Sequence, residues 1–174
     1  MIEVVLRAVR VDVGSSTPLL LLEEVQGDRV LPIYIGAPEA AAIAYALQGV
    51  SAPRPMTHDL LGKVITSLHA RLFSVEITEL VENTFFATLR LLGEQNEILV
   101  SARPSDAVAL ALRVGAPILV ADELMAREGK ILQLTDDDDS VDENGDSFDE
   151  GAAADIVAQF GEFLDQVKPE DFGQ

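Results

Sequence analysis

Two segments of the sequence share a pattern suited to binding an anion. Arg54–Asp59 reads Arg-Pro-Met-Thr-His-Asp, and Arg103–Asp106 reads Arg-Pro-Ser-Asp. In each, an arginine precedes a proline, and a hydroxyl residue that can cap a helix precedes an aspartate in the first turn. A helix start beside a guanidinium group suits a phosphate. The repeated pattern therefore predicts two anion-binding helix starts.

The side chains of these segments also have the types needed for hydrolysis. His58 is one of only two histidines and can transfer a proton near neutral pH. Asp59 and Asp106 can act as bases or hold a hard cation such as magnesium. The candidate catalytic residues are His58, Asp59, Asp106 and Glu39, and the candidate substrate-binding residues are Arg54, Thr57, Arg103 and Ser105.

The same residues have a purely structural interpretation. An aspartate in a first turn stabilises its helix by about 0.3–1 kcal/mol, and a neighbouring arginine can simply pair with it. His69, at a predicted helix end, fits a surface cap. Residue types alone leave both interpretations open, and catalysis requires the two segments to meet in space.

The amino-acid composition excludes several kinds of catalytic and metal site. The chain has no cysteine and two histidines, which excludes a thiolate zinc site, a cysteine nucleophile and a His-rich metal site. Walker, G-x-G-x-x-G, H-E-x-x-H and G-x-S-x-G motifs are also lacking in the sequence. A net charge of −18, concentrated toward the C-terminal end, disfavours nucleic-acid binding, although a local arginine cluster can still serve.

The strands and helices expected from the sequence indicate an α+β fold, with a mostly antiparallel or mixed β-sheet and packed helices. These elements must position the candidate residues. Short turns between the first three strands favour an antiparallel meander. The helix starting at Arg103 is apolar on every side and should be buried. Strands are expected at 2–13, 19–25, 29–35, 72–80, 84–92, 97–102 and 118–120, and helices at 40–48, 57–69, 105–112 and 122–127.

The helix at 57–69 carries one apolar face. Asp59 and Lys63 are expected opposite that face, at about 100° per residue. Thr57 and Ser105 are expected to cap their helices. The residues of the apolar face are Leu60, Leu61, Val64, Ile65 and Leu68.

Beyond the predicted domain at 1–134, the composition changes. Residues 135–151 are acidic and poor in apolar side chains, which predicts a disordered linker, and their spacing does not match a calcium loop. After this C-terminal acidic linker, residues 152–174 predict an amphipathic helix and a tail. Without a leader or a membrane-length apolar run, we expect a cytoplasmic protein with no membrane partner.

Several segments make the sequence similar to the bifunctional nuclease family, formerly a domain of unknown function. They resemble its motifs L-P-I-W-I-G, E-A-x-A-I-A, R-P-x-T-H-D-L, T-F-Y-A and S-A-R-P-S-D-A-I-A-L-A, with Tyr34 and Met56 as departures. The C-terminal end resembles that of actinobacterial members. The matching segments are Leu31–Gly36, Glu39–Ala44, Arg54–Leu61, Thr84–Ala87 and Ser101–Arg113.

The resemblance implies a compact α+β fold, homodimers, and DNase and RNase activity on nucleic acid. In that hypothesis Arg54 and Arg103 hold the scissile phosphate, and His58 transfers the proton. Asp59 and Asp106, with Glu39, hold a divalent cation such as magnesium or orient water. The competing hypothesis is a non-catalytic homodimeric binding or regulatory protein.

The C-terminal apolar stripe generates a first prediction. We expect removal of residues 136–174 to lower the unfolding temperature or change the oligomeric state, because such a stripe needs a partner surface. Thermal unfolding and size-exclusion chromatography of both chains measure this, and identical behaviour would contradict it. The stripe comprises Ile156, Phe160, Phe163, Leu164 and Val167.

Overall fold

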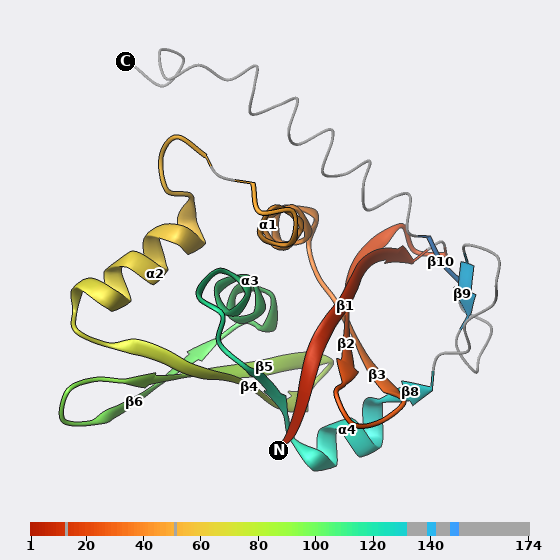
Figure 1. The fold of residues 1–174 in the computed structure, drawn as a ribbon. Coiled ribbons are helices and arrows are strands. Elements are labelled where there is room, and N and C mark those ends of the chain that lie inside the picture. Colours follow the sequence, from red (N-terminus) through yellow and green to blue (C-terminus); the bar gives the residue numbers. More distant parts are fainter. Residues whose placement is uncertain (13, 51, 132–138, 142–146, 150–174) are drawn as a thin grey trace.

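The computed structural model describes residues 1–12, 14–50, 52–131, 139–141 and 147–149, which form strands and helices around one mixed sheet (Figure 1). This confirms the predicted α+β class. The strands are β1 (Ile2–Asp12), β2 (Thr17–Glu24), β3 (Arg29–Tyr34), β4 (Arg71–Val81), β5 (Thr84–Leu92), β6 (Glu97–Ala102), β7 (Ile118–Val120), β8 (Lys130–Ile131), β9 (Asp139–Val141) and β10 (Ser147–Asp149). The helices are α1 (Ala37–Leu47), α2 (Thr57–Ser67), α3 (Pro104–Val114) and α4 (Asp122–Glu128).

A three-residue strand joins two antiparallel meanders into one sheet. The strand order is β6-β5-β4-β7-β1-β2-β3-β8, and β7 runs parallel to β4 but antiparallel to β1. Ile118 of β7 is in register with Val75 on one side and Val4 on the other. The predicted meander of the first three strands is confirmed. The second meander, β4-β5-β6, brings the strand before α3 beside the helices.

Two short strands, β9 and β10, lie in the interval 135–151, for which the sequence predicts a disordered linker; the rest of that interval lies outside the described residues. β10 pairs with Val11 and Asp12 at the end of β1. β1 is 11 residues long and β7 only three, so this end of β1 offers backbone groups that β7 does not pair. Ladder hydrogen bonds use the backbone, which an acidic composition does not remove. The predicted helix at 152–174 lies outside the described residues.

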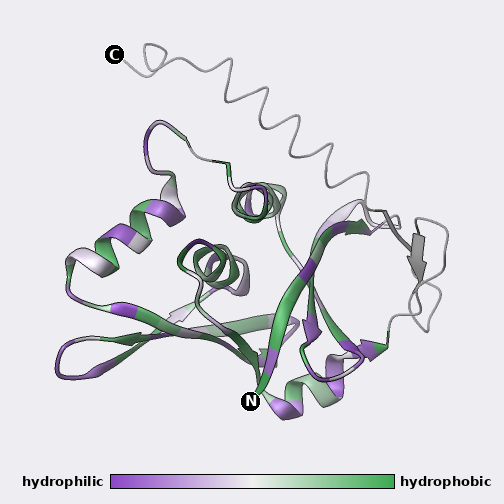
Figure 2. Cartoon of the chain, in the orientation of Figure 1, coloured by the Kyte–Doolittle hydropathy of each residue, from purple (hydrophilic) through white to green (hydrophobic). Residues whose placement is uncertain are grey.

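α3 is the buried centre of the helical layer. Figure 1 shows α1, α2 and α3 on one side of the sheet, and in Figure 2 the strands are largely green while α2 and α4 carry purple residues. Every residue from Ala107 to Ala111 is at most 1% exposed, which confirms the predicted burial. Three of these five are alanines, and their small side chains allow close helix packing. None of the described helices is long and apolar enough to cross a membrane.

The apolar face of α2 is largely exposed. Of that face only Ile65 is buried, and Leu68 is 73% exposed. α2 instead approaches α3 at Gly62, where an added Cβ would lie 3.3 Å from Val114 Cγ1. Asp59 lies on the side of α2 that faces α3, where it pairs with Arg113, and therefore opposite the exposed apolar face, as predicted. The remaining apolar residues of α2, all exposed, are Leu60, Leu61 and Val64.

The helix caps also differ from the prediction. Met56 caps α2 and Thr57 is its first residue, while Arg103 caps α3 and Ser105 is its second residue. Proline favours the first helical position, so the residue before Pro104 takes the cap. In α2 the Asp59 carboxylate accepts the Met56 backbone N–H at 2.9 Å. Neither hydroxyl residue therefore caps its helix.

The contrast between α3 and α2 gives a stability prediction. We expect Leu110→Ala to lower the unfolding free energy by about 2–5 kcal/mol, because Leu110 is fully buried. Leu60→Ala, at a site 53% exposed, should change it by about 0.5 kcal/mol or less. Urea unfolding of both variants measures this, and a large loss in Leu60→Ala would show that α2 is covered in solution.

Candidate active site

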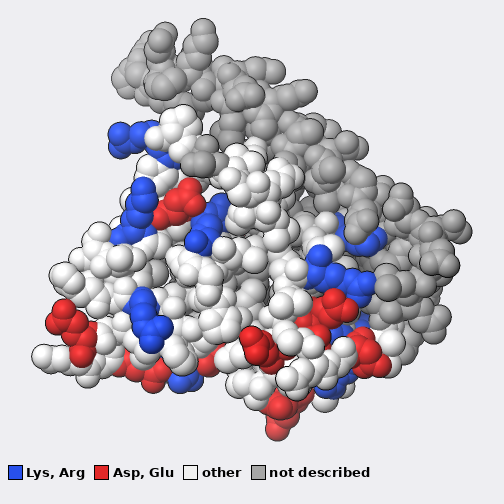
Figure 3. All heavy atoms as spheres, viewed as in Figure 1, with Lys and Arg blue, Asp and Glu red and all other residues white. Residues whose placement is uncertain are grey.

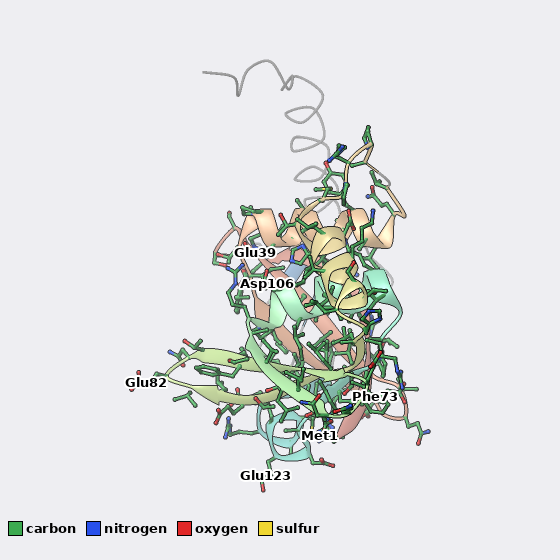
Figure 4. The ribbon with its side chains drawn as sticks, turned by 90° about the vertical axis from the view of Figure 1, so that its left-hand side faces the viewer. Met1, Glu39, Phe73, Glu82, Asp106 and Glu123 are labelled. Carbon is green, nitrogen blue, oxygen red and sulfur yellow. The ribbon has the colours of Figure 1, made fainter. Side chains whose placement is uncertain are left out.

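The two Arg-Pro segments converge at the starts of α2 and α3. His58, in the first turn of α2, places Nε2 3.2 Å from Asp106 Oδ1, in the first turn of α3. Figure 4 shows Asp106 next to Glu39 on the same side of the molecule. The His58 side chain is 12% exposed and that of Asp106 is 34% exposed. The spatial condition for a shared site is therefore met by this pair.

Arg103 connects α3 to α1 through two carboxylates. Its Nε donates to Asp106 Oδ2 at 2.6 Å, and its Nη2 donates to Asp106 Oδ1 at 3.1 Å. Its Nη1 donates to Glu39 Oε1 at 2.9 Å. A guanidinium has five N–H donors, so these three bonds leave two donors. Because the side chain is 64% exposed, the remaining donors can reach an external anion.

The ionised Asp106 carboxylate determines which ring nitrogen of His58 faces it with a proton. The hydrogen bonds from Arg103, with that from His58, hold the pKa of Asp106 below its ordinary value despite partial burial. An ionised carboxylate only accepts hydrogen bonds, so His58 must donate its Nε2 proton to Asp106. A neutral His58 then carries its lone pair on Nδ1, where it can accept a proton.

Asp59 pairs with a residue that the sequence analysis did not select. Arg113, in the last turn of α3, donates from Nε to Asp59 Oδ1 at 2.7 Å. It also donates to the carbonyl oxygens of Ala109 at 2.8 Å and Ala42 at 3.0 Å. Arg113 thus links α1, α2 and α3. Its spacing of seven residues from Asp106 places both on one face of α3, which is the signal that was missed.

Asp59 is consequently held as an anion in a structural position. Partial burial acts to raise its pKa, but hydrogen bonds from the Met56 N–H and Arg113 outweigh this and lower the pKa below its ordinary value. The Arg113 side chain is only 11% exposed. Asp59 therefore orients the helix start that carries His58.

Glu39 depends on the glycine that precedes α1. A Cβ on Gly36 would collide with Glu39 Oε2, although the Gly36 φ of −79° suits any residue. The missing side chain leaves room for the Glu39 carboxylate to fold back beside Gly36. Glu39 is 20% exposed and meets Arg103 from this position.

The other predicted residues are not part of this network. Arg54 is exposed in the loop before α2 and has no ion-pair partner among the described residues, and Thr57 is also exposed. Ser105 is 6% exposed and lines a cavity beside Arg103. The structure thus brings together Glu39, His58, Arg103 and Asp106, but neither Arg54 nor Thr57.

The described carboxylates do not form a ready metal cage. Within residues 1–131 and the two short strands, no group of three or more His, Asp or Glu side chains is arranged to hold a metal. Asp59 and Asp106, the candidate ligands, accept hydrogen bonds from Arg113 and Arg103 respectively. The two carboxylates thus belong to separate ion pairs.

Two cavities flank the Arg103–Asp106–His58 contacts. One, of about 490 Å³, is lined by Arg103, Glu39 and the β4–β5 turn. The other, of about 550 Å³, is lined by His58, Asp59, Lys63 and Arg113. The volumes suit small-molecule groups, which occupy roughly 300–1,000 Å³. A ligand crossing between them would pass both the exposed guanidinium and the histidine.

Surface charge is mixed on the face that Figure 3 draws, which is not the side of Glu39 and Asp106. On the face drawn in Figure 3, separate blue and red groups are spread over the described residues, and no continuous blue stripe crosses them. A broad basic groove for duplex nucleic acid is therefore not seen on this face.

The fold and the site define a small α+β protein with an Arg–Asp–His cluster between two helix starts. The chain belongs to the bifunctional nuclease domain family, which matches residues 20–133. It is 46% identical over 170 residues to Uncharacterized protein Rv1829 of Mycobacterium tuberculosis (strain ATCC 25618 / H37Rv), covering 98% of this chain and 97% of that protein. The family membership implied by the sequence motifs is confirmed.

Plant relatives carry the family's name. The chain is 27% identical over 128 residues to Bifunctional nuclease 1 of Oryza sativa subsp. japonica and to Bifunctional nuclease of Oryza minuta. Each match covers 71% of this chain but 39% of the plant protein. The similarity therefore concerns one part of those longer proteins.

The lowered pKa of Asp106 gives a pH prediction. A carboxylate with a depressed folded pKa stabilises the protein above its unfolded pKa, and this contribution is lost as the pH falls through the folded pKa. We expect Asp106→Asn to cost about 1 kcal/mol at pH 7, discounted for partial exposure. The difference from wild type should shrink as the pH falls below 3.8, the ordinary Asp value.

Urea unfolding of both proteins between pH 7 and pH 3 measures this difference. Glu123→Gln is the control, because Glu123 is exposed on α4, far from Asp106 in Figure 4, and forms no ion pair among the described residues. A cost of Asp106→Asn that stayed constant with pH would contradict the ion-pair assignment.

Proposed function

We propose that this protein is a nuclease that hydrolyses phosphodiester bonds of DNA and RNA. The observation that carries the proposal is the contact of His58 with Asp106, which Arg103 also binds, beside two cavities. Family membership supports a nuclease, and the names of the plant relatives are consistent with it.

His58 is the proposed proton acceptor. Asp106 accepts the Nε2 proton, which leaves Nδ1 to remove a proton from the attacking water. Because DNA lacks a 2′-hydroxyl, a mechanism common to both polymers cannot use that group as the nucleophile, and we assign the role to water. The water oxygen bonds to phosphorus and the bond to the leaving sugar oxygen breaks on the opposite side, where solvent protonates that oxygen; the imidazolium then releases its proton to solvent. Asp106 stabilises the imidazolium during this exchange.

Arg103 is the proposed phosphate ligand. Its two remaining donors can meet two phosphate oxygens and stabilise the charge that develops on them. Glu39 and Asp106 hold the guanidinium in a fixed direction, with hydrogen bonds of 2.6 to 3.1 Å. They also raise the pKa of Arg103, with Asp106 as the larger cause, so it stays cationic. Arg54, exposed in the loop before α2, would meet the neighbouring phosphate.

A divalent cation such as magnesium would need the substrate to complete its coordination. Magnesium is commonly held by one or two carboxylates together with substrate phosphates. Asp59 and Asp106 are the candidate carboxylates, and each is already engaged with an arginine. The steps above use only side chains of this chain, and the cation would add charge neutralisation at the phosphate.

The second candidate function is a non-catalytic homodimeric binding or regulatory protein. The exposed apolar face of α2 favours it, since large apolar surfaces often mark interfaces. Leu60 is 53% exposed and Leu68 is 73% exposed. In this alternative the Arg103 and Arg113 ion pairs are joints between helices.

The two histidines provide the decisive comparison. We expect His58→Asn to reduce hydrolysis of single-stranded DNA and RNA by about 10²–10⁴-fold, the usual contribution of general acid–base catalysis. His69→Asn should retain activity, because His69 is exposed beyond α2. His69 has a φ of 56°, a conformation that asparagine tolerates well.

Both variants and wild type must be purified in parallel and assayed at equal concentration. A contaminating host nuclease would give all three preparations the same activity. Equal cleavage by His58→Asn and His69→Asn would therefore reject the nuclease proposal and favour the binding protein.

A further inference from the structure

The second meander ends in an edge strand whose side chains are exposed on both faces. β6 pairs with β5 on one side, and no described strand pairs with its other side. The five residues from Glu97 to Ser101 are all exposed, with Ile98 at 43%, Leu99 at 60% and Val100 at 40%. The free edge of β6 thus presents unpaired backbone N–H and C=O groups, flanked by apolar side chains.

β6 lacks the features that usually keep an edge strand from pairing with another chain. Such features include proline, lysine and β-bulges. β6 contains neither proline nor lysine, and its register against β5 runs without a shift from Glu97 to Ala102. The one charged residue of the strand, Glu97, lies at its end and pairs with Arg90 at 2.9 Å. β6 is therefore a regular edge to which a further strand can be added.

An apolar surface continues from β6 to the end of α2. Ile98 and Val100 lie opposite the buried Leu91 and Leu89 of β5, so they belong to the sheet face that the helices cover. Leu68, which follows α2, is 73% exposed, and together with Ile98 it lines a hollow of about 360 Å³. Figure 1 shows α2 and β6 at the same side of the molecule. Contiguous exposed apolar surface of this kind marks an interaction site.

We propose that β6 pairs antiparallel with β6 of a second copy of this chain, which joins the two sheets across a two-fold axis. Two identical antiparallel strands are self-complementary, as a two-fold interface requires. Centred on Leu99, the register places Ile98 opposite the partner's Val100 and Glu97 opposite the partner's Ser101. An axis perpendicular to the sheet keeps the α2 helices of both copies on the same side of the joint. The pairing does not depend on the nuclease proposal.

The charges at this edge permit pairing with an identical strand. In the Leu99-centred register the two Glu97 residues are four positions apart, or about 13 Å, and each keeps its own Arg90. The residues between them, Ile98 to Ser101, are uncharged. With a net charge of −18, two copies repel one another at long range. Apolar burial and ladder hydrogen bonds therefore supply the attraction, and added salt should screen the repulsion.

A single introduced cysteine tests the register, because the chain has no cysteine of its own. Facing residues of an antiparallel pair have Cα atoms about 4.5–5.5 Å apart, which suits a disulfide. Under mild oxidation we expect full-length Leu99→Cys to form a linked dimer about tenfold or more faster than Val25→Cys. Val25 is the matched control, 49% exposed in the turn after β2. Equal rates on non-reducing denaturing gels would overturn the pairing.

Sedimentation equilibrium of the full chain measures the dimer without a cross-link. We expect Leu99→Lys to weaken dimerisation about tenfold or more, because two ammonium groups would face one another at the two-fold axis. Leu99 is 60% exposed, so the lysine should not disturb folding of the single copy. A wild-type chain that stays monomeric, or a dimer that Leu99→Lys leaves unchanged, would overturn the proposal.

An exposed leucine of α2 provides the control for this measurement. Leu60 is 53% exposed but does not line the hollow between α2 and β6, so Leu60→Lys should dimerise like wild type. Dimerisation of wild type should stay constant or strengthen when the salt concentration is raised, since the joint contains no intermolecular ion pair. A dimer that salt dissociates, or that Leu60→Lys disrupts as strongly as Leu99→Lys does, would overturn the assignment to β6.

Discussion

Burial of α3 is the constraint on which the rest of the structure depends. Its central residues, Ala107 to Ala111, are at most 1% exposed, so the helix cannot shift without exposing apolar surface on several sides. The sheet lies on one side of it, and α1 and α2 approach it from the others (Figure 1). A helix fixed in this way holds polar residues at both ends in constant positions. Arg103 and Asp106 at its start, and Arg113 at its end, therefore have defined partners.

The ion pairs at the two ends of α3 differ in what they leave available. Arg113 is 11% exposed and uses its guanidinium on three oxygen atoms from three helices, so it acts as a joint. Arg103 is 64% exposed and keeps two donors toward the cavity, so it can bind a ligand. Exposure thus separates an arginine enclosed in the fold from one that a ligand could reach, although both pair with an aspartate.

The net charge of the protein limits how it could bind a nucleic acid. With a net charge of −18, it cannot rely on long-range attraction to phosphates. Short-range contacts remain effective: a guanidinium held by two carboxylates and a histidine oriented by Asp106.

The sequence by itself determined β1 to β7, the four described helices, the antiparallel meander and the burial of α3, because turn residues and apolar periodicity act locally. It also identified the Arg-Pro segments that carry Arg103, Asp106 and His58. Only the tertiary structure decided that His58 meets Asp106, that Asp59 pairs with Arg113, and that the apolar face of α2 is exposed. The physical reason is that helical periodicity shows which side chains share a face. Which face is covered depends on the packing of segments distant in the chain.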